Sequence, residues 1–358
     1  MAAQNGRNRV LKNKRSAILR CLLATALLIP QEVGAWGNAG HEAVAYVAWQ
    51  QLKPEVQKRV IALIKLVPTL QNPNNPPKPR QAASIPGYSE WVKDLGTSGT
   101  PRDQQSLFLF MSAATWADSI KHEWLEDSDT PPHLTAEVNI GFTDKMSHGY
   151  WHFVDAAFAS DNSKTPSTPV PNAATQIVAL RAAIASKEPD LLKSYDLIWL
   201  EHLVGDIHQP LHGAVRYFAG IGDEGANLVT IKLPLAMEKQ FEGKLSKDSP
   251  TELHAFWDDL PGEGQPGQAL PVAATFAKMA PVATTGVADT DPTHWAAESL
   301  ALAQKDAYGA PIGASPAPPG GSSYAITPAY YSKAMRDAQD RIALAGARLA
   351  KLLNENLQ

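Results

Sequence analysis

Residues 202–212 read His202-Leu-Val-Gly-Asp206-Ile-His-Gln-Pro-Leu-His212, and this stretch carries the strongest indication of fold and chemistry. Residues four apart lie on one face of an α-helix, so His202 and Asp206 would present an imidazole and a carboxylate side by side. Pro210 would end the helix and let the chain turn, which aims His212 elsewhere. The stretch therefore predicts a helix that ends at a metal site, where Asp206 could bridge two ions.

A second stretch, His254-Ala-Phe-Trp-Asp258, repeats the His-x-x-x-Asp spacing. Three further potential ligands lie upstream, at His41, Asp118 and His152. These are too many ligands for one four-coordinate zinc ion. The pattern favours several metal ions bound by nitrogen and oxygen atoms, which is typical of metal-assisted hydrolysis. The alternative is a set of core histidines that are hydrogen-bonded within the protein.

Two of the upstream positions allow more than one interpretation. His152 stands between Trp151 and Phe153, an apolar setting in which a buried histidine needs a polar partner. Lys121 follows Asp118 by about one helical turn, which could be an ordinary surface ion pair. In the functional interpretation Asp118 is a metal ligand and Lys121 is a cation that faces a phosphate.

The first 35 residues have the order of a secretory signal peptide. An apolar run at residues 21–30 and small residues at 33–35 follow a basic segment. The run is too short to span a bilayer, so we expect cleavage before Trp36 rather than an uncleaved anchor. The basic residues are Arg7, Arg9, Lys12, Lys14, Arg15 and Arg20.

Cleavage would expose a free amine at Trp36 and change the bulk properties of the chain. An α-amino group has a pKa near ~8, so it could deprotonate and bind a metal together with His41; the alternative is a frayed terminus. Cleavage would also remove Cys21, the only cysteine, and lower the net charge from −4 to −9 by removing six basic residues and Glu32. An acidic protein is poorly suited to gripping duplex DNA through a basic surface.

The mature chain is expected to form one mainly α-helical domain, residues 36–358. Apolar spacing predicts helices at 40–67 (divided at Pro54), 107–124, 173–186, 189–207, 253–259, 273–279, 294–308 and 327–357. Alternation at 227–235 predicts a strand, which could form a small β-hairpin with the segment after it. Loops are expected at 68–103, 160–172 and 309–323, where Pro, Gly and Ser are frequent.

The motifs between Trp36 and Asp258, taken in the order in which they occur along the chain, resemble those of the S1/P1 nuclease family. Members of that family are exported zinc enzymes that cut single-stranded DNA and RNA and remove 3′-phosphates from nucleotides. The resemblance spans residues 36 to 258. It implies three zinc ions and a multi-helix fold of the type shared by zinc phospholipase C and nuclease P1. The motifs are Trp36, His41, Trp116-Ala-Asp118, Trp151-His152-Phe153, His202-x-x-x-Asp206, Gln-Pro-Leu-His212 and Leu-His254-x-x-x-Asp258.

The resemblance also implies a ligand set for each ion. The first zinc would be bound by Asp118, His152, His202 and Asp206. The second zinc would be bound by Trp36, through its amine and carbonyl, and by His41 and Asp206. The third zinc would be bound by His212, His254 and Asp258. Asp206 would thus bridge the first two ions.

The sequence departs from the family at the base-binding segment. The family usually has Gly-Gly-Asn, whereas this chain has Gly225-Ala226-Asn227. We expect Asn227 to hydrogen-bond a base and Phe153 to stack on it. The Asp-Glu pair often found after the histidine of the Pro-Leu-His segment is replaced here by Gly213-Ala214.

The expected function is an exported, zinc-dependent endonuclease with 3′-nucleotidase activity, either periplasmic or secreted. Asp118 would orient the attacking water, while Lys121 would stabilise charge on the phosphoryl oxygens. Substrates would be single-stranded DNA, RNA and 3′-nucleotides, cut to 5′-phosphate products. The protein is expected to be a monomer without a stable protein partner, and without a membrane span after processing.

Two other functions remain open. A zinc-dependent phospholipase C shares the fold and zinc ligands, but usually ends the last ligand pair with Glu, where this chain has Asp258. A non-enzymatic zinc-binding protein would need neither Lys121 nor an open coordination position. Hydrolysis of phosphatidylcholine, or zinc uptake without turnover, would distinguish these from a nuclease.

Overall fold

The computed structural model describes residues 36–66, 70–71, 84–85, 104–120, 148–159, 161–234, 250–262, 270–280, 282–313, 321 and 323–357. All of these residues belong to one unit, Val33–Gln358. The expected signal peptide at residues 1–35 lies outside the described residues. Among the helices that the structure describes, none is both long and apolar enough to cross a membrane.

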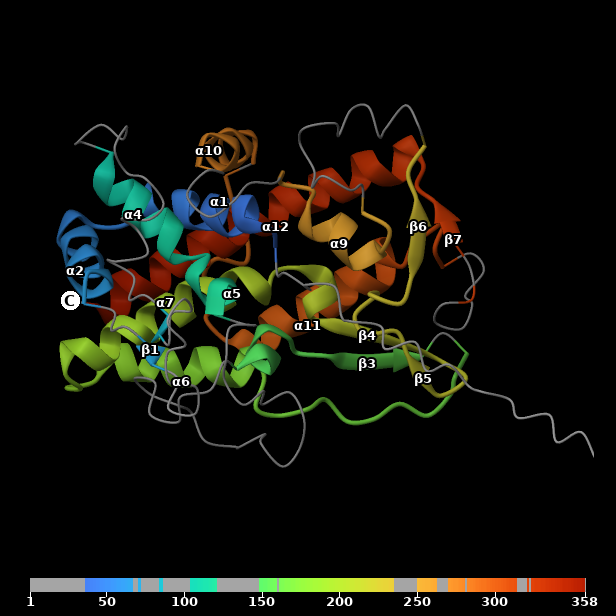
Figure 1. The fold of residues 1–358 in the computed structure, drawn as a ribbon, viewed down its shortest axis with the longest axis horizontal. Helices are drawn as coiled ribbons and strands as arrows, with labels where there is room; N and C mark the ends of the chain where they lie inside the picture. Colours follow the sequence, from blue (N-terminus) through green and yellow to red (C-terminus); the bar gives the residue numbers. More distant parts are fainter. Residues whose placement is uncertain are drawn as a thin grey trace, which may run out of the picture. The chain divides into compact units, whose positions relative to one another are not determined.

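The described unit is mainly α-helical (Figure 1), which confirms the predicted fold class. Its helices are α1 (Asn38–Trp49), α2 (Pro54–Ile64), α4 (Gln105–Ala113), α5 (Trp116–Ile120), α6 (Ala173–Ala185), α7 (Asp190–Asp206), α9 (Leu253–Asp258), α10 (Leu270–Met279), α11 (Pro292–Leu302) and α12 (Pro328–Asn356). The short turns η2 (Gly149–His152) and η3 (Pro210–His212) are 3₁₀-helical, and η4 (Ala303–Ala307) is π-helical. The strands are β1 (Leu70–Gln71), β2 (Ser84–Ile85), β3 (Ala156–Ala159), β4 (Ala214–Phe218), β5 (Ile221–Gly222), β6 (Thr230–Lys232) and β7 (Ser323–Ala325).

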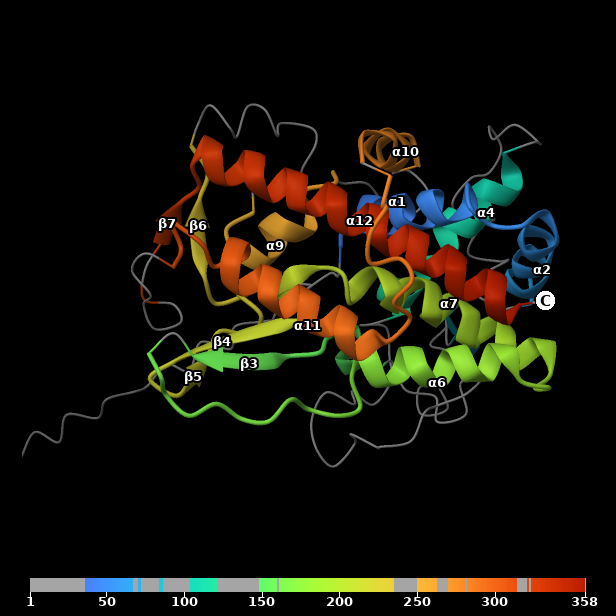
Figure 2. The same cartoon turned by 180° about the vertical axis from the view of Figure 1, so that it is seen from behind.

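Helix α7 lies at the centre of this unit. It contacts α1, α2, α5, α6 and α12, and Figure 2 shows α12 running past α1 and α7. Every residue of α7 from Lys193 to Asp206 is buried. A helix that is covered all round normally presents apolar side chains on every face. Because Glu201, His202 and Asp206 are nevertheless buried on α7, polar partners are needed inside the fold.

Proline and capping side chains set several helix boundaries. Pro54 occupies the first turn of α2, so the predicted helix 40–67 divides where Pro54 indicates. Asn172 and Thr175 form a reciprocal capping box at the start of α6. The predicted continuous helix 107–124 is wrong, because a turn at residues 114–115 separates α4 from α5. This turn matters for the site, since the carbonyl of Ala114 accepts a hydrogen bond from His202.

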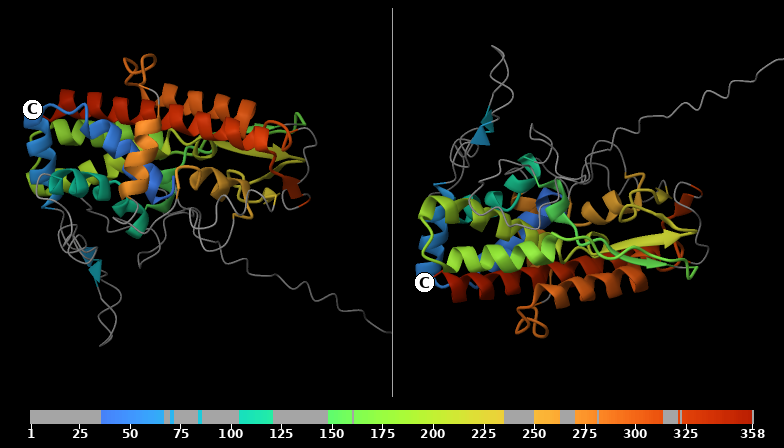
Figure 3. Two further views of the ribbon diagram at one scale, coloured as in Figure 1. Left: turned by 90° about the horizontal axis from the view of Figure 1, so that it is seen from above. Right: turned by 90° about the horizontal axis from the view of Figure 1, so that it is seen from below.

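The sheets β3–β4–β5 and β6–β7 lie toward one end of the helical unit, as Figures 1 and 3 show. Strand β3 pairs in parallel with β4, which pairs antiparallel with β5. The strand predicted at 227–235 is present as the shorter β6, which pairs in parallel with β7. Residues 229–231 also pair antiparallel with residues 251–253. The predicted hairpin partner is therefore accompanied by a second partner, β7, that local sequence did not indicate.

Candidate metal centre

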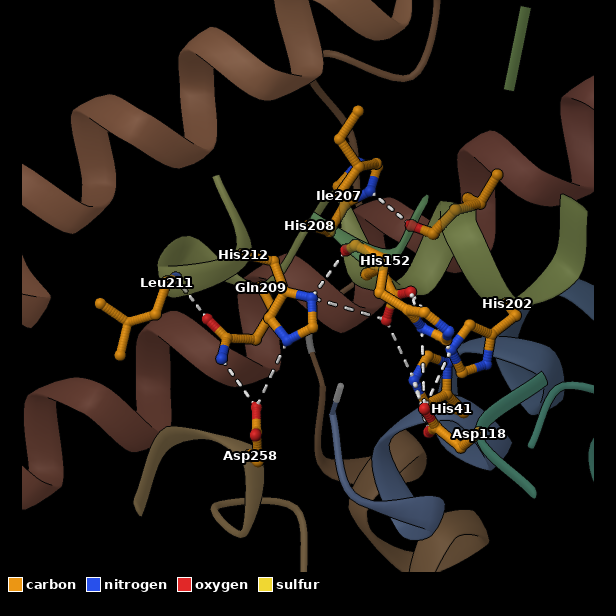
Figure 4. Close-up of polar contacts among 12 residues, drawn as sticks. His41, Asp118, His152, His202, Ile207, His208, Gln209, Leu211, His212 and Asp258 are labelled. Atoms are coloured by element: carbon orange, nitrogen blue, oxygen red, sulfur yellow. Dashed lines mark hydrogen bonds and ion pairs between the residues drawn. The ribbon is translucent and has the colours of Figure 1, made fainter. Parts of the chain in front are cut away.

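Three groups of histidine and aspartate side chains converge at the end of α7. The ligand atoms within each group lie within 4.8 Å of one another, and Figure 4 shows several of these side chains pointing toward a common region. The groups are His41, Asp118 and His202; His152, His202 and Asp206; and His212, His254 and Asp258. Every predicted histidine and aspartate ligand belongs to at least one group.

Local structure explains how α7 supplies ligands to more than one group. The helix ends at Asp206, one turn after His202, so both side chains lie on one face. The turn η3 follows, with Pro210 in its first position, and it carries His212 away from α7. Helix α9 presents His254 and Asp258 from the same face, four residues apart.

Asp206 lies at the centre of the first two groups. Its Oδ2 atom is 3.0 Å from Nδ1 of His152 and 3.1 Å from Nε2 of His202. Its Oδ1 atom is 3.3 Å from Nε2 of His41 and 3.8 Å from Nδ1 of His212. A carboxylate with imidazoles on both oxygen atoms has the arrangement of a bridging ligand.

Asp118 stands on the side of the first two groups that is open to solvent. Its side chain is 18% exposed, whereas those of His41, His152, His202 and Asp206 are fully buried. Its Oδ1 atom is 3.5 Å from Nε2 of His202 and 3.7 Å from Nδ1 of His152. Of these five side chains, Asp118 is therefore the one in contact with solvent.

Backbone carbonyl groups orient three of the histidine rings. Nδ1 of His202 donates to the carbonyl of Ala114 at 2.6 Å. Nδ1 of His212 donates to the carbonyl of His152 at 2.9 Å, and Nδ1 of His254 donates to that of Gly225 at 2.6 Å. A carbonyl oxygen can only accept, so each neutral ring carries its proton on Nδ1 and its lone pair on Nε2. Metal-binding histidines are usually held in this way.

The donor atoms fit divalent cations such as zinc. Nε2 of His202 and Nδ1 of His152 face each other at 2.8 Å beside Asp206. Within the part of the chain that the structure describes, the buried Nδ1 of His41 has no hydrogen-bond partner, and its Nε2 lies 3.3 Å from Oδ1 of Asp206 without forming a hydrogen bond. Buried polar atoms without partners are costly, and a bound cation would satisfy them. Imidazole nitrogen and carboxylate oxygen are common zinc ligands.

The protonation states of His41 and Asp206 suit metal binding, whereas Asp206 and Asp118 outweigh burial and raise the pKa of His202. Burial lowers the pKa of His41, and the neighbouring His202 lowers it further. Burial would raise the pKa of Asp206, but His202, His152 and His41 outweigh burial and hold that pKa well below 3.8. A neutral imidazole and an ionised carboxylate are the forms that bind a metal.

Gly205 permits the close approach of His41 to α7. The rings of His41 and His202 stack with centroids 3.9 Å apart. A Cβ atom at Gly205 would lie 2.7 Å from Nδ1 of His41, which is too close for any side chain. The glycine within His202-Leu-Val-Gly-Asp206 therefore has a packing reason that the His-x-x-x-Asp spacing alone does not reveal.

Phe153 lies against the third group. Its ring centroid is 4.6 Å from that of His212 and 6.2 Å from that of His254. Nε2 of His254 is 3.4 Å from Oδ2 of Asp258, and Nε2 of His212 is 3.9 Å from Oδ1. Because Phe153 is half-buried, part of its surface remains available beside these ligands.

The segment that contains Asn227 has an unusual backbone. Glu224, Gly225 and Ala226 all have positive φ angles, of 53°, 61° and 73°. The buried Asp223 supports this turn by accepting hydrogen bonds from the Ala226 amide, the Arg216 amide and the Tyr308 hydroxyl. Nδ2 of Asn227 donates to the carbonyl of Glu224 at 2.6 Å. The positions of Asp223, Arg216 and Tyr308 were not indicated by any motif.

The remaining two predicted site residues differ in what the structure describes. Trp36 is fully buried, and the amide of the adjacent Gly37 donates to the carbonyl of Asp258 at 3.0 Å. The predicted first residue of the mature chain is thus packed beside a ligand of the third group. Lys121 lies outside the described residues.

Comparisons with known proteins agree with the resemblance noted in the sequence. The family model described as S1/P1 Nuclease matches residues 36–358. Endonuclease 4 of Arabidopsis thaliana is 26% identical over 252 residues, which cover 68% of this chain and 62% of that protein. Nuclease S1 of Aspergillus oryzae is 24% identical over 257 residues, which cover 72% of this chain and 65% of that protein. The matches thus span less than two thirds of each relative's own length.

Proposed function

Because this chain belongs to the S1/P1 nuclease family, we propose that it is a zinc-dependent endonuclease acting on single-stranded DNA and RNA. We further propose that it removes the phosphate from 3′-nucleotides and that its cleavage products carry 5′-phosphates. The observation that carries the proposal is the set of three converging His and Asp groups, two of which share His202 and place His41 and His202 beside Asp206. Metal-assisted hydrolysis of phosphate esters requires such a set of closely spaced ligands.

The proposed ligand sets follow the family resemblance and are compatible with the distances. Asp118, His152, His202 and Asp206 would hold the first zinc, and His212, His254 and Asp258 the third. His41, Asp206 and the amine and carbonyl of Trp36 would hold the second. Support comes from the shared position of Asp206 and from the burial of Trp36.

The chain's own residues have distinct parts in the reaction. Zinc, when bound, supplies a Lewis acid that makes water acidic enough to react near neutral pH and that neutralises phosphate charge. The carboxylate of Asp118, at the solvent-exposed side of the site, would accept a hydrogen bond from the attacking water and aim its lone pair at phosphorus. Lys121 would stabilise negative charge on the phosphoryl oxygens.

We propose that a base of the substrate stacks on Phe153 and hydrogen-bonds to Asn227. Phe153 is partly exposed beside His212. Asn227 has one amide hydrogen directed to the Glu224 carbonyl, which would hold the rest of the amide in place for a base edge. A base must be unstacked to make both contacts, so single strands would be preferred.

We also propose that the protein is exported to the periplasm or the medium as residues 36–358, a single-domain monomer. The order of basic, apolar and small residues before Trp36 supports a cleaved signal peptide. The buried position of Trp36 supports a mature chain that begins there, because an unanchored terminus would be expected in solvent.

The test is hydrolysis of a single-stranded oligonucleotide by the zinc-loaded chain that begins at Trp36, with an EDTA-treated sample as control. Cleavage to 5′-phosphate products that EDTA abolishes is the expected result. A protein that binds zinc but leaves the oligonucleotide intact would contradict the nuclease proposal. Phosphatidylcholine would then be the substrate to try next.

A further inference from the structure

Gln209 connects the separate chain segments that supply the third ligand group. Its side chain is fully buried. Nε2 of Gln209 donates to Oδ1 of Asp258 at 2.7 Å, and Oε1 accepts from the amide of Leu211, the residue before His212. Figure 4 shows Gln209 between Leu211 and Asp258, next to His212.

The chemistry of these two contacts requires an amide side chain. The Leu211 N–H can only donate, so the carbonyl oxygen of Gln209 must face it. The NH₂ group must then face Asp258, where only a donor is compatible with an ionised carboxylate. A carboxylate at position 209 would place an oxygen atom against Asp258, and an apolar side chain would leave the buried Leu211 amide without an acceptor.

The backbone of Gln209 extends the connection to the first two groups. Its amide donates to the carbonyl of Asp206 at 2.9 Å, and its carbonyl accepts from the amide of His212 at 3.1 Å. Gln209 therefore contacts the segment that carries Asp206, the segment that carries His212 and the segment that carries Asp258.

The hydrogen bond from Gln209 selects the orientation of Asp258. Oδ1 is held by the amide, which leaves Oδ2 directed toward Nε2 of His254 at 3.4 Å. Without this bond the carboxylate could rotate about its side-chain torsions and lose that direction. Ligating carboxylates are commonly held by such hydrogen bonds, and removing one typically lowers metal affinity by about 10–100-fold.

We infer that Gln209 is the positioning residue of the third metal group (His212, His254 and Asp258). The affinity of this group for zinc depends on the side-chain amide of Gln209. The inference rests on the proposed function only in taking zinc as the ion. It concerns a residue that does not itself bind the metal.

The first test compares Gln209→Met with a matched control, Gln176→Met. Gln176, on α6, is also fully buried, but among the described residues its side chain has no hydrogen-bond partner. Zinc affinities are measured by competition with a chromogenic chelator. In Gln209→Met, one of three affinities should fall about 10–100-fold while the other two stay unchanged. Gln176→Met should retain all three.

A second measurement separates positioning from general destabilisation. Thermal unfolding is recorded with EDTA and with saturating zinc for each variant. A purely structural role would lower both melting temperatures equally. Loss of positioning should also shrink the increase in melting temperature that zinc produces, because weaker binding to the folded state stabilises it less. If the methionine variant does not fold, Gln209→Asn, a polar residue one methylene shorter, gives the same comparison.

The outcomes distinguish the two proposals. If Gln209→Met keeps the zinc affinities of the wild type and the same zinc-dependent increase in melting temperature, the role of Gln209 is overturned. The nuclease proposal is then left intact. A wild-type protein that binds no zinc would overturn the proposed function instead. A uniform loss of all three affinities in Gln209→Met, shared by Gln176→Met, would assign Gln209 to general packing.

Discussion

Single residues decide how closely the ligands can approach one another. Gly205 is the clearest case, because its missing side chain provides the space that the ring of His41 occupies against α7. In a helix interior, replacing Gly by Ala normally adds about 1 kcal/mol of stability. At this position the methyl group would instead displace a proposed zinc ligand.

We therefore predict that Gly205→Ala lowers zinc affinity at the groups that contain His41 and His202, by at least about tenfold. The measurement is zinc content after dialysis against buffered zinc. Leu191→Ala, at a half-exposed position of the same helix, is the control and should retain its zinc. Full zinc content in Gly205→Ala would show that His41 does not need this space.

Ala226 provides a second prediction at the residue scale. Its φ angle of 73° lies in the left-handed region, which costs a non-glycine residue roughly 1 kcal/mol. Glycine adopts this conformation without strain, so we predict that Ala226→Gly stabilises the protein by up to about 1 kcal/mol in urea unfolding. The same change at Ala182, an exposed position within α6, should destabilise it by about 0.5–1 kcal/mol. Destabilisation by both substitutions would argue against strain at Ala226.

At the scale of elements, an ionic cluster of buried arginines and the partly exposed Glu298 joins α11 and α12 to the end of α7. Arg348 donates to both carboxylate oxygens of Glu298 at 2.7 Å, and Arg341 donates to Glu298 at 2.9 Å. Nε of Arg341 also donates to the carbonyl of His208, and Ser299 donates to that of Ile207. The cluster thus binds the carbonyl groups of Ile207 and His208, the two residues that follow α7.

We predict that Glu298→Gln destabilises the protein by roughly 2 kcal/mol, less than for a fully buried pair because Glu298 is 36% exposed. Burial opposes ionisation of Glu298, but hydrogen bonds from Arg348 and Arg341 outweigh it and lower its pKa below 4.5. A lowered carboxyl pKa contributes stability above pH 4.5 that is lost as the pH falls through the folded-state value.

The pH dependence supplies the check on this prediction. The difference in unfolding free energy between wild type and Glu298→Gln should be constant above about pH 5 and should shrink below pH 4.5. Urea unfolding at a series of pH values measures it. A difference that grows toward acid pH would contradict the assignment of Glu298 as the stabilising carboxylate.

Most helices could be predicted from the sequence, because apolar spacing and proline positions are local signals. The β3–β4 pair could not, because strands of four and five residues carry little periodicity and are stabilised by partners far away in the chain. The same difference between local and long-range signals determines which site residues could be predicted. The spacing of His202 and Asp206 indicates a ligand pair directly, whereas the contact of Gln209 with Asp258 depends on how two distant segments pack.

For the whole molecule, the ligands are part of the core. Because α7 is buried from Lys193 to Asp206 and carries His202 and Asp206, removal of zinc would leave buried polar atoms without partners at the centre of the fold. We predict that EDTA lowers the melting temperature and that adding back zinc restores it. The rise in melting temperature should increase with zinc concentration. Scanning calorimetry measures this, and magnesium should not substitute. Equal melting temperatures with zinc and EDTA would contradict it.

The proposed start of the mature chain at Trp36 gives a further prediction at this scale. If the amine of Trp36 binds zinc, then a chain beginning at Ala35 would present an amide there instead. We predict that this single extra residue removes one zinc per molecule and most of the activity. A chain extended by one residue after Gln358 is the control. Three bound zinc ions and full activity in the longer chain would exclude the amine as a ligand.

His152 takes part in two neighbouring groups in different ways. Its ring lies beside Asp206, while its carbonyl oxygen holds the ring of His212. An ion that fixes the ring of His152 therefore also steadies the backbone that orients a ligand of the next ion. We expect loading to be cooperative, so that at limiting metal the population divides into empty and filled molecules, with few that are half loaded.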